Sequence, residues 1–320
     1  MYKLFAIAKN TFIETLRQPV YAVIIVAALF MFFLSPSLTM YTMSDDNKLL
    51  RELGLSTLCL TSLFIAIFSA SGAVAEEIEN KTITTVLSKP VQRPIFIAAK
   101  FLGVAAAVVL AHYICTIALL MAIRHGVLES VDDTHDWTVS ATAAVVVAAA
   151  FLLSAFFNYA YDWKFSSTAI VLTAIFATFG IVFLFFIDRN WQFNPKNNGI
   201  NALDVYGAVL LLLAAIIIVA LAVALSAKFN IVVTLSACVG IFLLGLVTDW
   251  AFGDLAKTQL WAKICYFLVP NLQVFWISDA IYEGSVVPLK YILITASYAL
   301  CYTIGILALA VALFQRRQVG

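Results

Sequence analysis

Long apolar stretches alternate along this chain with shorter polar segments. A helix that crosses a bilayer needs about 20 mostly apolar residues. Eight stretches meet this requirement, and they contain no Asp, Glu, Lys or Arg apart from Lys290 at the start of the last: 20–40, 55–75, 101–123, 138–158, 168–187, 205–225, 231–248 and 290–313. The pattern predicts an all-α, polytopic transmembrane helical bundle of about eight spans, built as a single domain over residues 1–320.

The lead before the first span, residues 1–19, is amphipathic. On a helical wheel one face collects its apolar side chains, and the opposite face carries Lys3, Lys9, Asn10 and Arg17. This distribution is typical of a helix that lies in the membrane interface. The apolar face consists of Leu4, Phe5, Ala8, Phe12 and Leu16. We therefore expect an interfacial helix that ends where the chain turns at Pro19.

A charged segment, residues 76–100, separates the second and third spans and reads EEIENKTITTVLSKPVQRPIFIAAK. Its inner part, 77–87, places Ile78, Ile83, Val86 and Leu87 on one half of a helical wheel, which predicts a short amphipathic helix. The residue before a proline is steered away from helical geometry, so Lys89-Pro90 and Arg93-Pro94 are predicted stops. Two interpretations follow from the residues: a helix that docks a partner, or a solvated connector.

Two polar segments are predicted on the opposite side of the membrane. Residues 249–289 favour an amphipathic helix from Asp254 to Phe267 and a second one from Pro270 to Gly284. Because both are rich in Trp and Phe, we expect them in the interface or dipping into the bilayer. Residues 124–137 are short and acidic. Their side chains predict either a plain solvated loop or a weak metal site formed by His125, His135, Asp132 and Asp133.

Composition and charge agree with a membrane protein. The chain is 63% hydrophobic and 12% charged, whereas soluble domains carry roughly 25% charged residues. Its net charge of +1 gives no reason to expect a nucleic-acid partner. With the N-terminus inside, the inner segments hold eleven of the 19 Lys and Arg residues and the outer segments hold eight. Such an excess is typical of cytoplasmic segments, so the sequence predicts that both termini are cytoplasmic.

The chemistry missing from the sequence excludes several classes of protein. It has no G-x-x-x-x-G-K-[ST] loop for nucleotide phosphates, no H-E-x-x-H and no G-x-S-x-G. The five cysteines lack the spacing of a zinc site or a disulfide framework. Ion-coupled transporters usually place charged groups inside the membrane. In the spans His112 is the ionisable candidate besides tyrosines and cysteines, and it either relays a proton or hydrogen-bonds a neighbouring helix.

The segment 76–100 resembles the signature of the permease subunits of type-2 ATP-binding-cassette exporters. In that family a Glu, a Thr, a leucine, a Ser-x-Pro turn, an Arg and a Lys lead into the third span. Lys81 and Ala99 stand where the family usually has Gly. The lead, residues 1–19, is similar to the family's elbow helix. The matching residues of the signature are Glu77, Thr82, Leu87, Ser88, Pro90, Arg93 and Lys100.

The resemblance covers residues 1–103 and 250–317, and the middle departs from it because the family commonly has six spans. It implies a permease with no cofactor, metal or catalysis of its own, situated in the cell's inner (plasma) membrane. Its partners would be a second permease copy, in a homodimer or heterodimer, and two ABC ATPase subunits that hydrolyse ATP. The matching residues would form the ATPase-coupling site, and residues 249–289 would form re-entrant helices. Two alternatives remain: a non-transporting scaffold or biogenesis protein, and an ion-coupled secondary transporter.

Overall fold

The computed structural model describes residues 2–38, 46–75, 92–127, 135–195, 199–283 and 285–315. Within these ranges seven helices are long and apolar enough to cross a membrane. They are α2 (Pro19–Leu38), α3 (Asp46–Ala70) with its continuation η1 (Ser71–Ala75), α6 (Arg93–His125), α7 (Trp137–Tyr161), α8 (Phe165–Phe186), α9 (Ala202–Ser226) and α15 (Leu289–Gln315). The chain is therefore a polytopic, all-α membrane protein, as its apolar pattern predicts.

The predicted span 231–248 is shorter than expected. The structure forms α10 (Ile231–Leu246) there, with 16 residues. At 1.5 Å per residue this helix is about 24 Å long, less than the roughly 30 Å of the hydrocarbon layer. Two spans are longer than predicted, because α3 begins at Asp46 and α6 at Arg93. The turns added to α3 carry Asp46, Lys48, Arg51 and Glu52, whereas those added to α6 are mostly apolar between Arg93 and Lys100.

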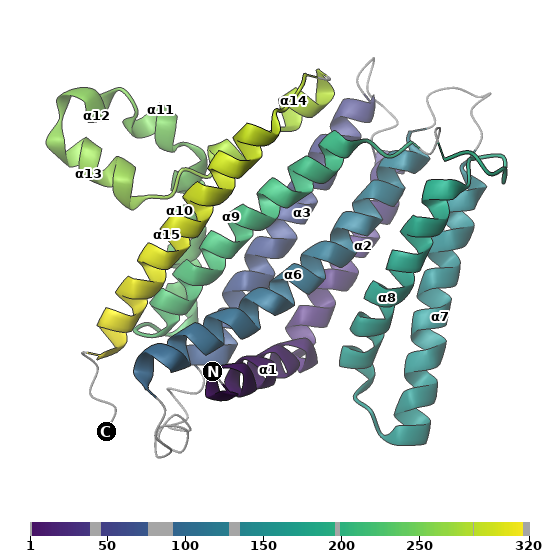
Figure 1. Cartoon of the computed structure of the whole chain (residues 1–320), viewed down its shortest axis with the longest axis horizontal. Helices are drawn as coiled ribbons and strands as arrows, with labels where there is room; N and C mark the ends of the chain where they lie inside the picture. The colour runs from purple at the N-terminus through teal and green to yellow at the C-terminus, as the bar shows by residue number, and fades with distance from the viewer. Residues whose placement is uncertain are drawn as a thin grey trace.

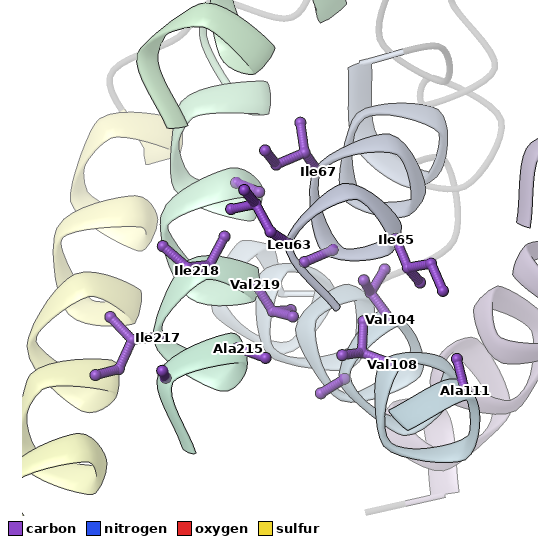
Figure 2. Packing of buried hydrophobic residues seen from close by; sticks show 14 of the residues in the cluster. Leu63, Ile65, Ile67, Val104, Val108, Ala111, Ala215, Ile217, Ile218 and Val219 are labelled. Carbon is purple, nitrogen blue, oxygen red and sulfur yellow. The ribbon is translucent and has the colours of Figure 1, made fainter. Parts of the chain in front are cut away.

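Helices α3, α6 and α9 form the centre of the bundle (Figure 1). More than 60% of the apolar window of each is buried, compared with 22% for α7 and for α15. Figure 2 shows side chains from all three helices in one cluster, among them Ile65 of α3, Val108 of α6 and Val219 of α9. Many neighbours are alanines, which let helix backbones approach closely within a membrane.

A buried histidine ties the three central helices together. His112 of α6 is 4% exposed. Its Nε2 lies 2.9 Å from the carbonyl oxygen of Ala208 in α9, and its Nδ1 lies 2.7 Å from the hydroxyl of Ser62 in α3. A carbonyl only accepts hydrogen bonds, so Nε2 carries the proton and the neutral ring accepts from Ser62 at Nδ1. This geometry agrees with the interpretation of His112 as a helix-packing residue.

Helices α7 and α8 form a hairpin that packs mainly on itself and stands beside the central bundle (Figure 1). Buried polar groups attach it to the end of α6. Arg124 Nε lies 3.4 Å from Asp136 Oδ2, and Arg124 also donates to the carbonyls of Leu184 and Ile187. Asp136 caps α7 by accepting from the backbone N–H groups of Thr138 and Val139. We call this group the Arg124–Asp136 clamp.

The clamp gives the attachment of the hairpin a pH dependence. Burial alone raises the pKa of Asp136, but hydrogen bonds from Thr138 and Val139 and the charge of Arg124 outweigh it, and the pKa lies below its ordinary 3.8. A carboxyl whose pKa is lowered by folding stabilises the protein above its unfolded pKa, and this contribution is lost as the pH falls through the folded pKa. We expect the melting temperature of the wild type, measured by a thermal scan in detergent, to be constant from pH 7 to pH 5 and to decrease below pH 3.8. In Asp136→Asn this decrease at low pH should be smaller.

Residues 248–282 depart from the two predicted helices. The structure forms α11 (Thr248–Phe252), α12 (Leu255–Thr258), α13 (Leu260–Leu268), the 3-10 turn η2 (Gln273–Phe275) and α14 (Ser278–Tyr282). The predicted helix from Asp254 to Phe267 is interrupted at Gln259, whose backbone is extended. We call α11–α13 the aromatic lobe; among the described residues it packs chiefly on itself, and it lies beside the upper half of α15 (Figure 1).

The chain that leaves the aromatic lobe is held at the middle of α15. The N–H of Leu272, in the chain that follows α13, donates to the carbonyl of Gly245 at 2.9 Å. This bond joins the chain leaving the lobe to the end of α10. Tyr302 of α15 donates to the carbonyl of Leu268 at 2.5 Å. Since Tyr302 lies about 20 Å along α15 from Leu289, this junction is well below the end of the span. The lobe is therefore joined to the middle of α15 rather than to its beginning.

Candidate coupling site

The structure describes two of the seven predicted coupling residues. Arg93 and Lys100 lie in the first two turns of α6. The predicted amphipathic helix 77–87 lies outside the described residues, and so do the other five coupling residues: Glu77, Thr82, Leu87, Ser88 and Pro90. What can be described is therefore the C-terminal part of the predicted site, at the start of α6, and the helices that pack around it.

Helix α6 begins at Arg93, directly after the extended residue Gln92. Pro94 lies in the first turn, where a proline is tolerated because that N–H group has no partner within the helix. The predicted stop at Arg93-Pro94 therefore marks the beginning of the next helix. With 33 residues, α6 is about 50 Å long, so a rigid helix connects this exit to the opposite end of the bundle.

Lys100 is buried, although its charge predicts a solvated position. Its side chain is 2% exposed, and Nζ lies 5.7 Å from the centre of the Phe96 ring, one turn earlier in α6. A lysine keeps a buried charge only when other groups compensate for the lost water. At this depth Lys100 would act from inside the protein, by fixing the start of α6, and Arg93 is the more accessible of the two.

The elbow helix α1 (Tyr2–Arg17) packs against the start of α6. A Cβ atom at Gly103 of α6 would lie 2.6 Å from the carbonyl oxygen of Ala8 and 2.6 Å from Cβ of Thr11. Only glycine permits this approach. Thr11 and Thr15 of α1 are at most 1% exposed, whereas Phe5 on the predicted apolar face is 66% exposed. The rest of that face is not free, because Leu16 is 3% exposed within the core and Phe12 packs against it. Helix α1 thus packs on the bundle through both small polar and apolar residues, and its position in the membrane interface stays a prediction.

Helix α1 also reaches the end of α3. The turn η1 (Ser71–Ala75) is π-helical and precedes the segment 76–91 in the chain. A Cβ atom at Gly72 would lie 2.5 Å from Nε2 of Gln18, the residue between α1 and α2. The elbow therefore contacts both helices that flank the charged segment, α3 at its end and α6 at its beginning.

The sequence pattern did not predict the contact residues Gly103, Gly72 and Gln18. A signal was present, since Gly103 closes the family-like run from Lys100 and Thr11 and Thr15 share one face of α1. That signal shows a small-residue face but not which helix it meets.

Two of the four residues of the possible metal site can be placed. The rings of His125 and His135 lie 5.6 Å apart, while Asp132 and Asp133 lie outside the described residues. Among the described residues no three His, Cys, Asp or Glu side chains form a metal-binding group.

Comparison with known proteins adds one match. The family model described as "ABC-2 family transporter protein" matches residues 5–160, about half of the chain. The match runs from α1 to the end of α7 and includes the charged segment, η1 and the start of α6. A search of curated proteins found no match. The elbow helix, the seven long apolar helices and the family match together identify the chain as an ABC-2 type permease, a non-catalytic membrane component of an ABC transporter.

Proposed function

We propose that this permease is an exporter subunit driven by a separate ABC ATPase, with residues 77–87 as the helix that docks on the ATPase. The contact of α1 with both η1 and the start of α6 is the observation that supports this proposal most directly. Through this contact the helices on either side of residues 76–91, η1 and α6, belong to one packed unit. A force on these residues would therefore reach α3 and α6 together. Rigid helices joined in this way move as a lever.

The proposal places the α1 end of the bundle in the cytoplasm and both termini with it, in the cell's inner membrane. The excess of basic residues in the segments at this end supports that orientation. Two permease copies, identical or different, would enclose the pathway, and two ATPase subunits would bind beneath them. In this arrangement Glu77 and Arg93 face the ATPase, while Lys100 holds α6 against the elbow.

One observation favours a transporter over a static scaffold. A scaffold needs anchoring and a binding surface, but it has no need for a buried polar junction among α1, η1 and α6. An ion-coupled transporter is disfavoured because the predicted spans contain no Asp or Glu that could bind a coupling ion. His112 lies between Ser62 of α3 and Ala208 of α9, which is the position of a residue that joins helices.

Docking by residues 77–87 predicts that two substitutions in this segment uncouple the complex. Glu77→Ala removes a charge from the predicted contact. Thr82→Pro removes an N–H group and breaks the predicted helix. We expect at least a tenfold lower ATP turnover for Thr82→Pro, and a smaller loss for Glu77→Ala, in the complex purified with its co-expressed ATPase.

The matched control is Lys228→Ala, which removes an exposed charge from the turn between α9 and α10 at the same end of the bundle. It should leave ATP turnover unchanged. Wild-type turnover in an intact complex for both Glu77→Ala and Thr82→Pro would contradict docking by this segment. Failure of any ATPase to co-purify with the wild-type protein would instead favour the scaffold.

A further inference from the structure

Helices α7 and α8, which lie side by side (Figure 1), enclose an apolar groove in the half of the hairpin nearest the Arg124–Asp136 clamp. Its volume is about 350 Å³. Along α7 it runs from Ala141 to Ala149, which is about 12 Å. Trp191, in the turn that follows α8, lines the groove at the clamp end. The wall formed by α8 consists mainly of three rings at helical spacing, Phe176, Phe179 and Phe183.

The groove has a closed floor and an open side. A Cβ atom at Gly180 of α8 would lie 3.0 Å from Cγ2 of Val146 and 3.1 Å from Cγ2 of Thr142, so α7 and α8 are in close contact there. Cε of Met121 in α6 would lie at 3.3 Å and closes the floor from behind. Gly180 and Val146 are buried, whereas Val145 at the rim is 66% exposed. The groove therefore opens on the side of the hairpin away from the bundle.

The chemistry of the lining selects an apolar ligand. Thr142 is the lining residue with a hydroxyl, and it donates to the carbonyl of Thr138 at 2.6 Å. The walls otherwise present methyl groups and aromatic rings. Transfer of a polar group to such a site without a compensating hydrogen bond is unfavourable. In helices that cross the hydrocarbon layer, this lining fits an alkyl chain rather than a polar cargo.

The width of the groove distinguishes between apolar occupants. A volume of about 350 Å³ over about 12 Å gives a mean cross-section of about 30 Å². An α-helix with its side chains is about 10–12 Å across, so its cross-section is at least about 80 Å². The groove is therefore too narrow for a helix of a second copy, whereas an unbranched hydrocarbon chain fits.

The turn at the clamp end carries groups that suit a lipid headgroup. Trp191 is 55% exposed and has a φ of 60°, a strained conformation for a bulky residue. The Asp188 carboxylate holds the turn by accepting from the N–H groups of Asn190 and Gln192. The Arg189 side chain is 56% exposed, and among the described residues its Nη1 has no partner. Tryptophan is enriched at membrane interfaces, and arginine binds phosphate.

We propose that the groove binds one acyl chain of a membrane phospholipid, whose phosphate lies at the turn that carries Trp191 and Arg189. Because the groove occupies the half of α7 nearest the clamp, the lipid belongs to the leaflet opposite the elbow. Its chain covers the side of the hairpin that faces away from the bundle and bridges α7 to α8. This site does not depend on coupling to an ATPase.

Photo-crosslinking in nanodiscs tests the site directly. The nanodiscs contain phosphatidylcholine and a small fraction of phosphatidylcholine with a diazirine in one acyl chain, and mass spectrometry maps the cross-links. We expect several-fold more cross-linking to residues 141–149 and 176–183 than to the apolar face of α15, which gives the background from passing lipid. Equal labelling would mean lipid in rapid exchange only and would overturn the proposal. The exposed residues of that face are Leu293, Leu300, Ile304 and Leu309.

A pair of neighbouring substitutions locates the bound chain. Ala149→Leu fills the end of the groove far from the clamp, and Ala148→Leu is the matched control, because Ala148 is exposed outside the groove. Cross-linking of the groove should decrease to background in Ala149→Leu and stay unchanged in Ala148→Leu. Labelling of Ala149→Leu at the wild-type level would contradict the site. Trp191→Ala, which lies outside both helices, should lower the labelling several-fold even where Ala149→Leu does not fold.

A thermal scan gives a second readout, because a ligand that binds the folded state raises the melting temperature. Phosphatidylcholine added to the permease in detergent should raise the melting temperature of the wild type and of Ala148→Leu, and raise that of Ala149→Leu much less. Equal shifts in all three proteins would count against the groove. Disulfide cross-linking between copies of Val145→Cys, above the level given by the native cysteines, would place a second copy over the groove and overturn the proposal.

Discussion

An Arg124→Met variant is expected to lose about 3 kcal/mol of stability, the lower end of the range for breaking a buried ion pair, because Arg189 Nε still lies 3.6 Å from Asp136 Oδ2 and compensates part of its charge. The Asp136 carboxylate is 0% exposed, and Arg124 is 4% exposed. Arg124 also donates to the carbonyls of Leu184 and Ile187, and both acceptors would lose their donor. Unfolding should begin with separation of the α7–α8 hairpin from α6, which limited proteolysis between α6 and α7 and a thermal scan together detect.

The exposed ion pair of the aromatic lobe provides a control for charge removal as such. Lys257 Nζ lies 2.8 Å from Asp254 Oδ1, and both side chains are largely in solvent. Because exposed pairs contribute little, Lys257→Met should leave the melting temperature unchanged. In the double variant Arg124→Met/Asp136→Asn the two losses should not add, since each removes the same interaction. A melting temperature of wild-type value for Arg124→Met would show that the clamp does not hold the hairpin.

A Gly103→Val variant is expected to lower ATP turnover of the assembled transporter by more than tenfold while the spans stay folded. The new side chain would meet the backbone carbonyl of Ala8, which cannot move without displacing α1. Overpacking of this kind costs about 1–3 kcal/mol, and here that cost separates the elbow from the start of α6. If α1 passes force between the two helices that flank the docking segment, turnover decreases far more than stability.

Two glycines serve as controls for the glycine substitution itself. Gly240 of α10 and Gly305 of α15 have no described atom within 4 Å of the position that a Cβ would take. Valine at either position should leave turnover and melting temperature close to those of the wild type. Thr11→Gly should relieve part of the Gly103→Val clash but not the contact with the Ala8 carbonyl, so only partial recovery is expected. Full turnover in Gly103→Val alone would show that contact between α1 and α6 is unimportant for coupling.

The apolar pattern predicted the spans well because a chain in lipid has few structural options. With no water to satisfy the backbone, a stretch of about 20 apolar residues must form a helix. The predicted stretch 205–225, for example, became α9 (Ala202–Ser226). The elbow was equally readable, since its amphipathic pattern and the following Pro19 are both local. The pattern overestimated 231–248, because hydropathy counts apolar residues and does not show where a helix ends against another segment.

Charge alone was a poor guide to the environment of individual residues. Lys100, Arg124 and Asp136 all lie in segments that read as solvated, yet each is less than 5% exposed. Their partners are far away in the chain: Arg124 meets a carboxylate twelve residues later and a carbonyl at Leu184, sixty residues later. Sequence spacing carries no signal for such contacts, because they depend on which helix ends the bundle brings together.

Local hydropathy and helical periodicity were enough to show that this chain is a helical membrane protein, where most of its spans begin and end, and which charged segment interrupts them. The packed bundle was needed to show that the elbow contacts both α3 and α6, that Gly103 and Gly72 permit these contacts, and that α3 ends in a π turn. These features depend on backbones from distant parts of the chain approaching within van der Waals contact, which no local pattern specifies.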